Sequence, residues 1–299
     1  MRVDGFLNLL KPPGMTSHDV VVFARRLLGQ RRVGHLGTLD PAAAGVLPLA
    51  LGRATRLSPL AGGEKEYRAE VCLGATTTTL DAEGAVTAFG DASRVTRAEV
   101  TAALARFEGE VEQRPPPYSA AHVGGRRLHE LAREGRQMEG RPRRVRIHRL
   151  ELTGFWPGRA ARALLAIECG PGTYVRVLAG ELGRVLGCGA YLSFLVRTRV
   201  GRFALPEALT LEEFRERAET GHFDRAVLPP DWPLVHLPAT ALDDDAAWAF
   251  LHGAAAMVAG CPTGLVRAYS ADGRFLGVGA VSEEAELRPR VVVREGVAA

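Results

Sequence analysis

The chain has 299 residues, of which 46% are apolar and 24% charged, the composition of an ordinary soluble protein. This length predicts two domains, or one large domain with an appendage, and the composition excludes collagen-like, disordered and disulfide-scaffold proteins. No apolar run reaches the roughly 20 residues of a membrane span. The apolar stretch at the N-terminus is too short for a signal peptide and is interrupted by Lys11-Pro12-Pro13. We therefore expect a cytoplasmic protein.

Positive charge is concentrated in the first half of the chain. Residues 1–150 carry 23 Lys and Arg against 16 Asp and Glu, whereas residues 151–299 carry 15 against 18. Residues 124–149 alone contain nine arginines and three glutamates. Such a block fits a nucleic-acid binder, because guanidinium groups bind phosphates bidentately, and it fits a solvated surface equally well. Only Lys11 and Lys65 are lysines, which points to two sites that need a compact ammonium group, with chance as the rival explanation.

The sequence gives no support for a metal centre or an ordinary cofactor. Its four cysteines form no close CxxC pair of the kind that zinc sites use, and we expect isolated, buried or half-buried thiols: Cys72, Cys169, Cys188 and Cys261. The Walker A, dinucleotide-binding, HExxH and GxSxG patterns are not found.

The first half of the chain mixes strands, helices and one glycine-rich loop. In chain order, the pattern predicts a buried strand at 5–10, a helix at 19–28, a loop at 34–45, an alternating strand at 65–73 and a helix at 96–108. Gly29 suits the C-terminal cap of the first helix. Thr96 and Glu99 form a capping box for the second, which we expect Gly109 to end.

The second half continues the mixture and ends in a small β-rich unit. It predicts strands at 144–152, 162–169 and 190–200, and helices at 173–186 and 210–220. A Pro-rich linker at 228–238 is followed by a helix at 245–252 and a hairpin whose turn is 271–274. Strands and helices without strict alternation favour the α+β class over a doubly wound sheet.

Asp40 is the first candidate for chemistry. It lies in the 34–45 loop, where glycines allow sharp bends, and Pro41 keeps it out of a helix. Catalytic groups often lie in such loops, although an aspartate that caps a turn fits the same pattern. His35 belongs to the same loop and can be structural or catalytic.

Three further residues are singled out by their positions. Tyr67 and Lys65 share one face of the alternating strand, and Tyr67 is either a core residue or an aromatic plate for a nucleobase, a contact worth about 1–3 kcal/mol. Arg176 falls in the first turn of an apolar helix, where the helix dipole disfavours a cation. If buried it needs an anionic partner; if exposed it is an ordinary surface residue. Leu195 by itself fits plain core.

Six segments form an ordered series over nearly the whole chain: GFLNLLKPPGMTSHDVV, RVGHLGTLDPAAAGVLPLALGRATRL, EKEYRAEVCLGATTTTLDAEG, PPPYSAAHVGGRRLHELAREG, CGPGTYVRVLAGELGRVLGCGAYLSFLVRTRVG and GLVRAYSADGRFLGVG. Together they closely resemble the bacterial tRNA pseudouridine synthase B family, the tRNA pseudouridine(55) synthases. The GHLGTLDPAAAGVLP and GTYVRVLAGELG segments are highly specific, and the C-terminal segment is less so.

The resemblance implies an α+β pseudouridine synthase fold with a mixed, largely antiparallel sheet in residues 1–232. It implies an RNA-gripping insertion at about 115–150 and a small PUA-like domain in residues 233–299. The reaction implied is isomerisation of a flipped-out uridine in the T-loop of tRNA, with no cofactor and no metal, by a monomer without an obligate protein partner. One departure concerns the tail: residues 239–299 carry five Arg against eight Asp and Glu, which puts its RNA contact in doubt.

The resemblance also assigns roles to residues. Asp40 would be the nucleophile and attack C1′ of ribose or C6 of uracil, Arg176 would pair with it, and Tyr67 would stack on the uracil near the C5 proton. Tyr174 and Leu195 would line the pocket. The other expected substrate contacts are His35, which would buttress the space left by the flipped base, Asp81 in the polar network, Lys11 and Lys65, and Arg126 and Arg127, which would hold the RNA backbone.

Three rival readings stay open. A non-catalytic RNA-binding or RNA-folding protein on the same scaffold is disfavoured by the intact set of Asp40, Tyr67 and Arg176. A synthase for another RNA, such as ribosomal RNA, is disfavoured by GGRRLHELAREG, which resembles the T-loop-gripping part of the tRNA enzymes. An unrelated hydrolase that uses Asp40 with a glutamate lacks a suitably placed second carboxylate.

Overall fold

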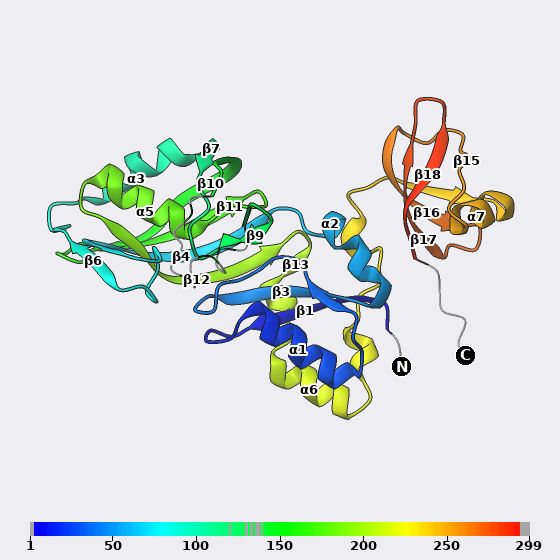
Figure 1. Cartoon of the computed structure of the whole chain (residues 1–299), viewed down its shortest axis with the longest axis horizontal. Helices are drawn as coiled ribbons and strands as arrows, with labels where there is room; N and C mark the ends of the chain where they lie inside the picture. The colour runs from blue at the N-terminus through cyan, green and yellow to red at the C-terminus, as the bar shows by residue number, and fades with distance from the viewer. Residues whose placement is uncertain are drawn as a thin grey trace.

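The structure is a computed structural model that describes residues 3–119, 121–128, 131, 134, 138 and 140–293. It consists of a large body and a smaller domain at one end of it, formed by the C-terminal part of the chain (Figure 1). None of the helices in the described ranges combines the length and the apolar character needed to cross a membrane.

A nine-stranded mixed sheet runs through the large body. Seven strands follow one another in space in the order β1 (Gly5–Lys11), β3 (Ala44–Leu51), β12 (Ala190–Val200), β4 (Lys65–Leu73), β11 (Arg162–Cys169), β10 (Arg143–Trp156) and β7 (Gly109–Gln113). Two short strands, β2 (Val33–His35) and β13 (Phe203–Ala204), pair with β3 and β12. Only β3 and β12 pair in parallel, and the other pairs are antiparallel. The mixed, largely antiparallel sheet is therefore confirmed.

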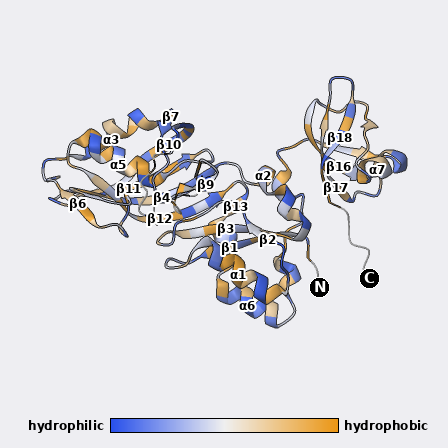
Figure 2. Cartoon of the chain, viewed as in Figure 1, coloured by the Kyte–Doolittle hydropathy of each residue, from blue (hydrophilic) through white to orange (hydrophobic). Residues whose placement is uncertain are grey.

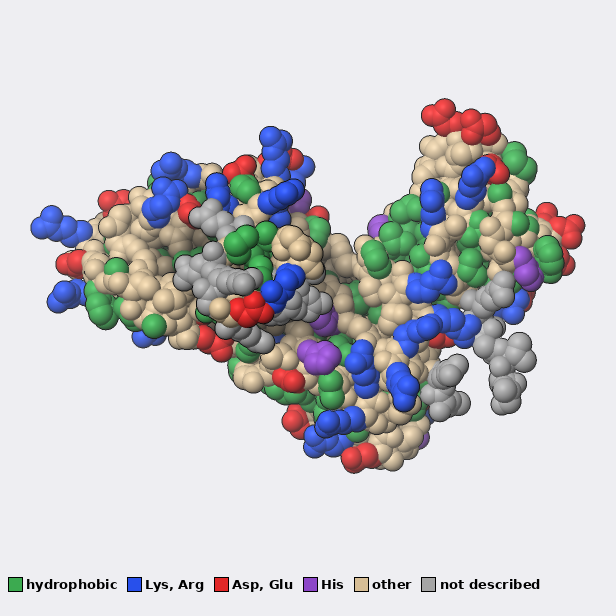
Figure 3. All heavy atoms as spheres, in the orientation of Figure 1, with side chains coloured by type: hydrophobic (Ala, Val, Ile, Leu, Met, Phe, Trp, Pro, Cys, Tyr) green, Lys and Arg blue, Asp and Glu red, His purple; other side chains and the backbone are tan. Residues whose placement is uncertain are grey.

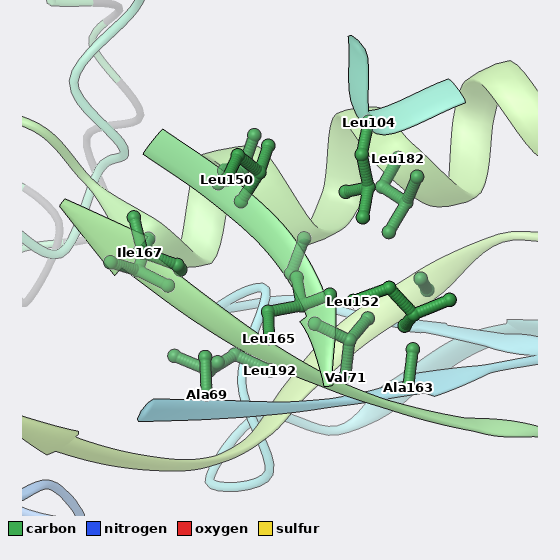
Figure 4. Close-up of a cluster of buried hydrophobic side chains, with 14 of the residues drawn as sticks. Ala69, Val71, Leu104, Leu150, Leu152, Ala163, Leu165, Ile167, Leu182 and Leu192 are labelled. Atoms are coloured by element: carbon green, nitrogen blue, oxygen red, sulfur yellow. The ribbon is translucent and has the colours of Figure 1, made fainter. Parts of the chain in front are cut away.

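Helices cover the two ends of this sheet separately. Helices α3 (Arg97–Leu104) and α5 (Val175–Leu186) pack on β4, β10, β11 and β12 around the largest apolar core. In Figure 4, Leu104 and Leu182 from these helices lie above Leu152 and Leu165 of the sheet. At the other end, α1 (Ser17–Leu28) and α6 (Leu211–Glu219) cover β1 and β3 around a second core.

The covering helices are amphipathic and end as their sequences indicate. In α1, Val20 and Ala24 are fully buried, and the helix carries both hydrophobic and hydrophilic residues (Figure 2). Thr16 and Asp19 form a capping box at its start, and Gly29 ends it with a φ of 58°. A left-handed residue at this position is most easily a glycine, because no Cβ is present to clash.

The C-terminal domain is a five-stranded sheet with one helix. Its strands follow the order β14 (Ala239–Leu242), β16 (Gly264–Ser270), β17 (Phe275–Val281), β18 (Glu286–Val292) and β15 (Ala256–Met257), and its helix is α7 (Asp244–Leu251). The hairpin expected around 271–274 joins β16 to β17. Val278 and Val293 belong to the same apolar cluster as Phe6 and Phe203 of the large body, so the two parts share a buried contact.

Two expectations need correction, and one strand is not expected from the sequence. The irregular loop covers only residues 36–43, because His35 ends β2 and Ala44 starts β3. Strand β3 is buried along almost its whole length and therefore shows no alternation, and it contains a proline and a glycine that argue against a strand. The helix expected at 96–108 is α-helical to Leu104 and continues as a 3-10 turn to Phe107, and Gly109 begins β7.

The sequence pattern also gives no sign of the small β5–β6 sheet (Ala75–Thr77 and Val86–Phe89), because β6 is exposed throughout. The other helices and strands that the sequence predicts are confirmed within one or two residues at their ends, and β4 and β12 have the expected bounds. Strand β10 is the exception, since it runs from Arg143 to Trp156. The four cysteines are free thiols, buried or half-buried, as expected.

Candidate active site

Asp40 lies in the 36–43 loop, and buried side chains fix the backbone of this loop from one side. The Ser17 hydroxyl donates to the Leu39 carbonyl at 3.0 Å and accepts from the Leu39 N–H at 2.8 Å. The Lys11 ammonium donates to the Pro41 carbonyl at 3.1 Å. Both neighbours of Asp40 are thereby tied to the start of the chain, which positions the carboxylate between them.

Arg197 of β12 holds the other side of the loop. Its fully buried guanidinium donates to the carbonyls of Gly37 at 3.0 Å, Thr38 at 3.3 Å and Val46 at 2.8 Å. Buried carbonyls need donors, and one side chain supplies three. The close approach requires Gly45, which has a φ of +119° and where a Cβ would lie 2.2 Å from the Arg197 carbonyl oxygen.

Asp40 and Arg176 form a bidentate ion pair. Arg176 Nε lies 2.8 Å from Asp40 Oδ2, and Nη2 lies 3.1 Å from Oδ1. Nη1 of the same guanidinium lies 3.5 Å from Asp81 Oδ2. Arg176 is 4% exposed, whereas the side chain of Asp40 keeps 36% exposure. The anionic partner that a buried Arg176 requires is therefore present, and a ligand can reach the Asp40 carboxylate.

The start of helix α5 fixes the position of Arg176. Tyr174 is its N-cap residue and makes no capping bond with its own side chain. Instead, the buried Gln113 amide of β7 accepts from the Tyr174 N–H at 2.9 Å and donates to its carbonyl at 3.3 Å. The remaining Arg176 donors bond the carbonyls of Thr79 at 3.1 Å and Tyr118 at 3.0 Å.

Tyr67 lies on the inward face of β4, 7% exposed, with its hydroxyl hydrogen-bonded to Arg197. Burial raises the pKa of Tyr67, although the positive charge of Arg197 acts in the opposite direction. The phenol is therefore neutral at physiological pH, and its ring forms an apolar wall of the site.

Both lysines of the chain lie at this site. Burial lowers the pKa of Lys11 to about 8, while the charge of Asp40 partly offsets that effect. Burial also lowers the pKa of Lys65, and the nearby Arg197 lowers it further. Their placement supports the view that the two positions need a compact ammonium group.

Asp40, Lys65, Tyr67 and Arg176 lie at the wall of a cavity of about 580 Å³. A volume of this size accommodates a small-molecule-sized group such as a nucleoside. Its lining residues are Thr38, Leu39, Asp40, Lys65, Tyr67, Pro115, Ser119, Ala121, Arg141, Arg143, Gly172, Thr173, Tyr174, Val175, Arg176 and Leu195. Asp40 and five other expected site residues thus meet in one cavity: Lys65, Tyr67, Tyr174, Arg176 and Leu195. Leu195, which the sequence pattern alone would assign to the core, contributes an apolar wall.

The other expected residues lie around the cavity or away from it. His35 ends β2 and accepts a hydrogen bond from the Gly37 N–H at 3.2 Å through Nδ1. Arg126 lies on β9 (Arg126–Arg127), which pairs with β8 (His122–Val123), and its guanidinium forms an exposed ion pair with Glu134. The side chain of Arg127 lies outside the described part of the structure.

Two residues that shape the site are not singled out by sequence reasoning. Arg197 shares the inward face of β12 with Leu195, so a charge on the buried side of a strand is the signal that marks it. Gln113 is buried at the end of β7 and carries no comparable signal. In the described ranges, no group of His, Cys, Asp and Glu side chains has the geometry of a metal site.

Family models match three consecutive stretches of the chain. Residues 25–175 match the N-terminal domain of TruB family pseudouridylate synthases. Residues 176–235 match a tRNA pseudouridylate synthase B C-terminal domain, and residues 238–293 match the C-terminal model of pseudouridine synthase II TruB.

Curated relatives and solved structures agree with these matches. The chain is 53% identical to tRNA pseudouridine synthase B of Symbiobacterium thermophilum over 86% of this chain and 84% of the relative. It is 42% identical to the Pseudomonas aeruginosa protein of the same name over 98% and 96%. Its structure resembles a chain of an H/ACA RNP bound to a substrate RNA containing 2'-deoxyuridine, with a TM-score of 0.73 and 29% identity over 97% of this chain and 85% of that one. A chain of a Cbf5-Nop10-Gar1 complex is also similar, with a TM-score of 0.71 and 30% identity over 98% and 84%.

Proposed function

The chain belongs to the TruB family of tRNA pseudouridine synthases and is an isomerase, and we propose that its substrate is the uridine at position 55 in the T-loop of tRNA. The pseudouridine synthase fold expected from the sequence accords with this membership. The observation that carries the proposal is the Asp40–Arg176 ion pair beside the Tyr67 ring in a cavity large enough for a nucleoside. A uridine enters such a cavity after flipping out of the loop, which costs least for a base that is already unpaired.

The reaction rearranges the nucleoside without adding or removing atoms. The bond between N1 of uracil and C1′ of ribose breaks, the uracil turns, and a bond forms between C5 and C1′. The proton on C5 leaves, and N1 gains a proton. Asp40 is the nucleophile, through attack at C1′ or at C6, so that one difficult step is divided into two easier ones.

The neighbouring groups serve this carboxylate and the base. Arg176 holds both oxygens of Asp40, so the carboxylate cannot turn away from the substrate. Tyr67 stacks on the uracil, and its hydroxyl lies on the side of the C5 proton that must leave. Tyr174 and Leu195 enclose the base, and His35 supports the loop from which it was flipped.

The rest of the chain binds RNA or supports the site. We assign residues 1–232 to the catalytic domain, with the basic insertion at about 115–150 gripping the T-loop through Arg126 and Arg127. Residues 233–299 form the PUA-like domain. The enzyme works in the cytoplasm as a monomer.

Incubation of the purified protein with a T-loop stem-loop tests the proposal. Carbodiimide treatment followed by primer extension maps pseudouridine, and we expect a single stop at the uridine that corresponds to position 55. An anticodon stem-loop and a ribosomal RNA hairpin serve as controls and remain unmodified. Modification of the ribosomal hairpin but not of the T-loop would assign the site to a different RNA.

A further inference from the structure

The cavity carries more positive charge than its ion pair needs. Five charged side chains line it: one carboxylate, from Asp40, and four cations, from Lys65, Arg141, Arg143 and Arg176. Arg176 is matched by Asp40 and, behind it, by Asp81. Among the described residues, no carboxylate is paired with Arg141 or Arg143.

Arg143 is held in one orientation at this cavity. Its guanidinium carbon lies 4.5 Å from the centroid of the Tyr174 ring, and Nη2 donates to the Gly172 carbonyl. Stacking on an aromatic ring fixes the plane of a guanidinium group and leaves its edge free for hydrogen bonds. The Nε–H group is buried and has no partner among the described residues. A buried donor without an acceptor is unfavourable. The Nη1 group of the same guanidinium makes no hydrogen bond to a described residue and is the donor left for a ligand.

Arg141 lies two residues earlier and lines the same cavity as an exposed side chain. The cavity thus combines an apolar, aromatic part, formed by Tyr67, Tyr174 and Leu195, with two guanidinium groups. A nucleotide has the matching division: a neutral base that stacks, and a phosphodiester that carries the charge. Guanidinium groups bind phosphate oxygens through two parallel N–H donors.

We propose, on the basis of the proposed function, that Arg143 and Arg141 bind a phosphodiester directly adjacent to the flipped uridine. Arg143 supplies a preorganised guanidinium group, and Arg141 adds a second charge. By gripping the backbone beside the target base, this pair places C1′ of that nucleotide opposite Asp40. The contact distinguishes a nucleotide within a strand from a free nucleoside.

Neutralising one phosphate at a time tests this contact. Stem-loops are made with an uncharged methylphosphonate at the linkage 5′ or 3′ to the target uridine, and the dissociation constant and single-turnover rate are measured for each. We expect the wild-type protein to lose about tenfold in affinity at one of the two linkages, the loss of a charge-assisted hydrogen bond. We expect Arg143→Gln to bind the unmodified RNA about tenfold more weakly than the wild type does. Methylphosphonate at the sensitive linkage should then cause no further loss of affinity in this variant.

Arg184→Gln is the matched control, because it removes the same charge from an exposed position on α5 where Arg184 pairs with Glu181. This variant keeps the full tenfold methylphosphonate effect. The proposal is overturned if the wild type tolerates methylphosphonate at both linkages, a measurement that needs no variant to fold. It is also overturned if the affinity loss from Arg143→Gln and the affinity loss from methylphosphonate are independent and multiply at both linkages. Arg143 would then only support Tyr174. Because affinity is read without turnover, failure of the wild type to modify the unmodified stem-loop would count against the proposed function alone.

Discussion

Arg176 connects Asp40 to three other residues through a single guanidinium. It reaches Asp81 and the carbonyls of Thr79 and Tyr118 as well as both oxygens of Asp40. Removing one partner of a buried ion pair is strongly destabilising when it leaves an uncompensated charge. Here the second carboxylate remains when Asp40 is replaced, and Asp40 is itself partly exposed, so its loss is tolerated by the fold.

Asp40→Asn separates chemistry from binding and stability. Asparagine keeps the shape but is not a nucleophile, so we expect pseudouridine formation to vanish while RNA affinity stays within a few fold, because binding depends on many phosphate contacts. Single-turnover assays and filter binding measure the two quantities, and thermal unfolding verifies the fold. Measurable product from the purified variant would end the assignment of Asp40 as nucleophile.

Tyr67→Phe divides the two roles of this side chain. The ring remains and still stacks, so RNA affinity should survive. The hydroxyl and its bond with Arg197 are lost, so turnover should fall at least tenfold if the hydroxyl takes part in removing the C5 proton. Rates measured on RNA that carries deuterium at C5 of the target uridine show whether the affected step is the removal of this proton. Wild-type turnover would show that only the ring matters.

Lys11 makes the stability of the protein depend on pH. Its pKa is lowered from 10.5 to about 8 by burial, so the folded chain releases this proton near pH 8 and the unfolded chain only near 10.5. Unfolding therefore takes up a proton in this window, and the free energy of unfolding rises with pH. Urea unfolding of the wild type and of Lys11→Met between pH 7 and 10.5 isolates the effect. The free energy of unfolding of the wild type should rise relative to that of the variant as the pH increases. A difference independent of pH would show an unshifted lysine.

The 36–43 loop is the element on which the site depends, and it is rigid because buried donors hold its carbonyls. The sequence predicts an irregular, glycine-containing loop around Asp40, and this is confirmed. What it cannot predict is which side chains hold that loop, because these contacts are long-range: Ser17 comes from α1 and Arg197 from β12. Strand β3 is missed for a related reason, since burial on both faces removes the alternation that marks β4.

Ser17→Ala tests the support of this loop. The change leaves the Leu39 N–H and carbonyl without partners, and we expect a loss of about 2 kcal/mol in the free energy of unfolding. Turnover should fall while RNA affinity is retained, since Asp40 is no longer held in one position. Ser193→Ala is the control, because both hydrogen bonds of the Ser193 hydroxyl go to Glu70 of β4 and not to the 36–43 loop. Equal losses of turnover in both variants would point to general destabilisation.

At the scale of the whole molecule, the two domains are joined by polar and apolar contacts. The Tyr269 hydroxyl donates to Asp231 Oδ2 at 2.7 Å, and Arg56 Nη1 donates to the Val292 carbonyl at 3.2 Å. Figure 3 shows acidic side chains at the tip and the outer end of the C-terminal domain, and Arg side chains on its flank toward the large body. On this face, the acidic side chains of the domain lie away from the catalytic domain (Figure 3), a distribution that the net charge of residues 239–299 does not show.

Deleting the chain after Pro238 tests what this domain does. All proposed catalytic residues lie before it, so we expect the 1–238 fragment to isomerise uridine in a T-loop stem-loop. Its net acidic charge gives little reason for strong phosphate binding, so we expect a smaller loss of affinity than in an Arg126→Gln, Arg127→Gln double variant. The fragment should unfold at a lower temperature, because the apolar cluster that contains Phe6 and Leu234 loses Val278 and Val293.

Circular dichroism and size exclusion establish first that the fragment is folded and monodisperse, since the exposed apolar surface favours aggregation. Binding is then compared at several salt concentrations, because each lost phosphate contact reduces the slope of log affinity against log salt by about 0.7–0.9. An unchanged slope in the fragment places the phosphate contacts on the catalytic domain. A folded fragment that binds more weakly than the double variant, with a slope reduced by two contacts or more, would instead make the basic flank of the C-terminal domain part of the RNA-binding surface.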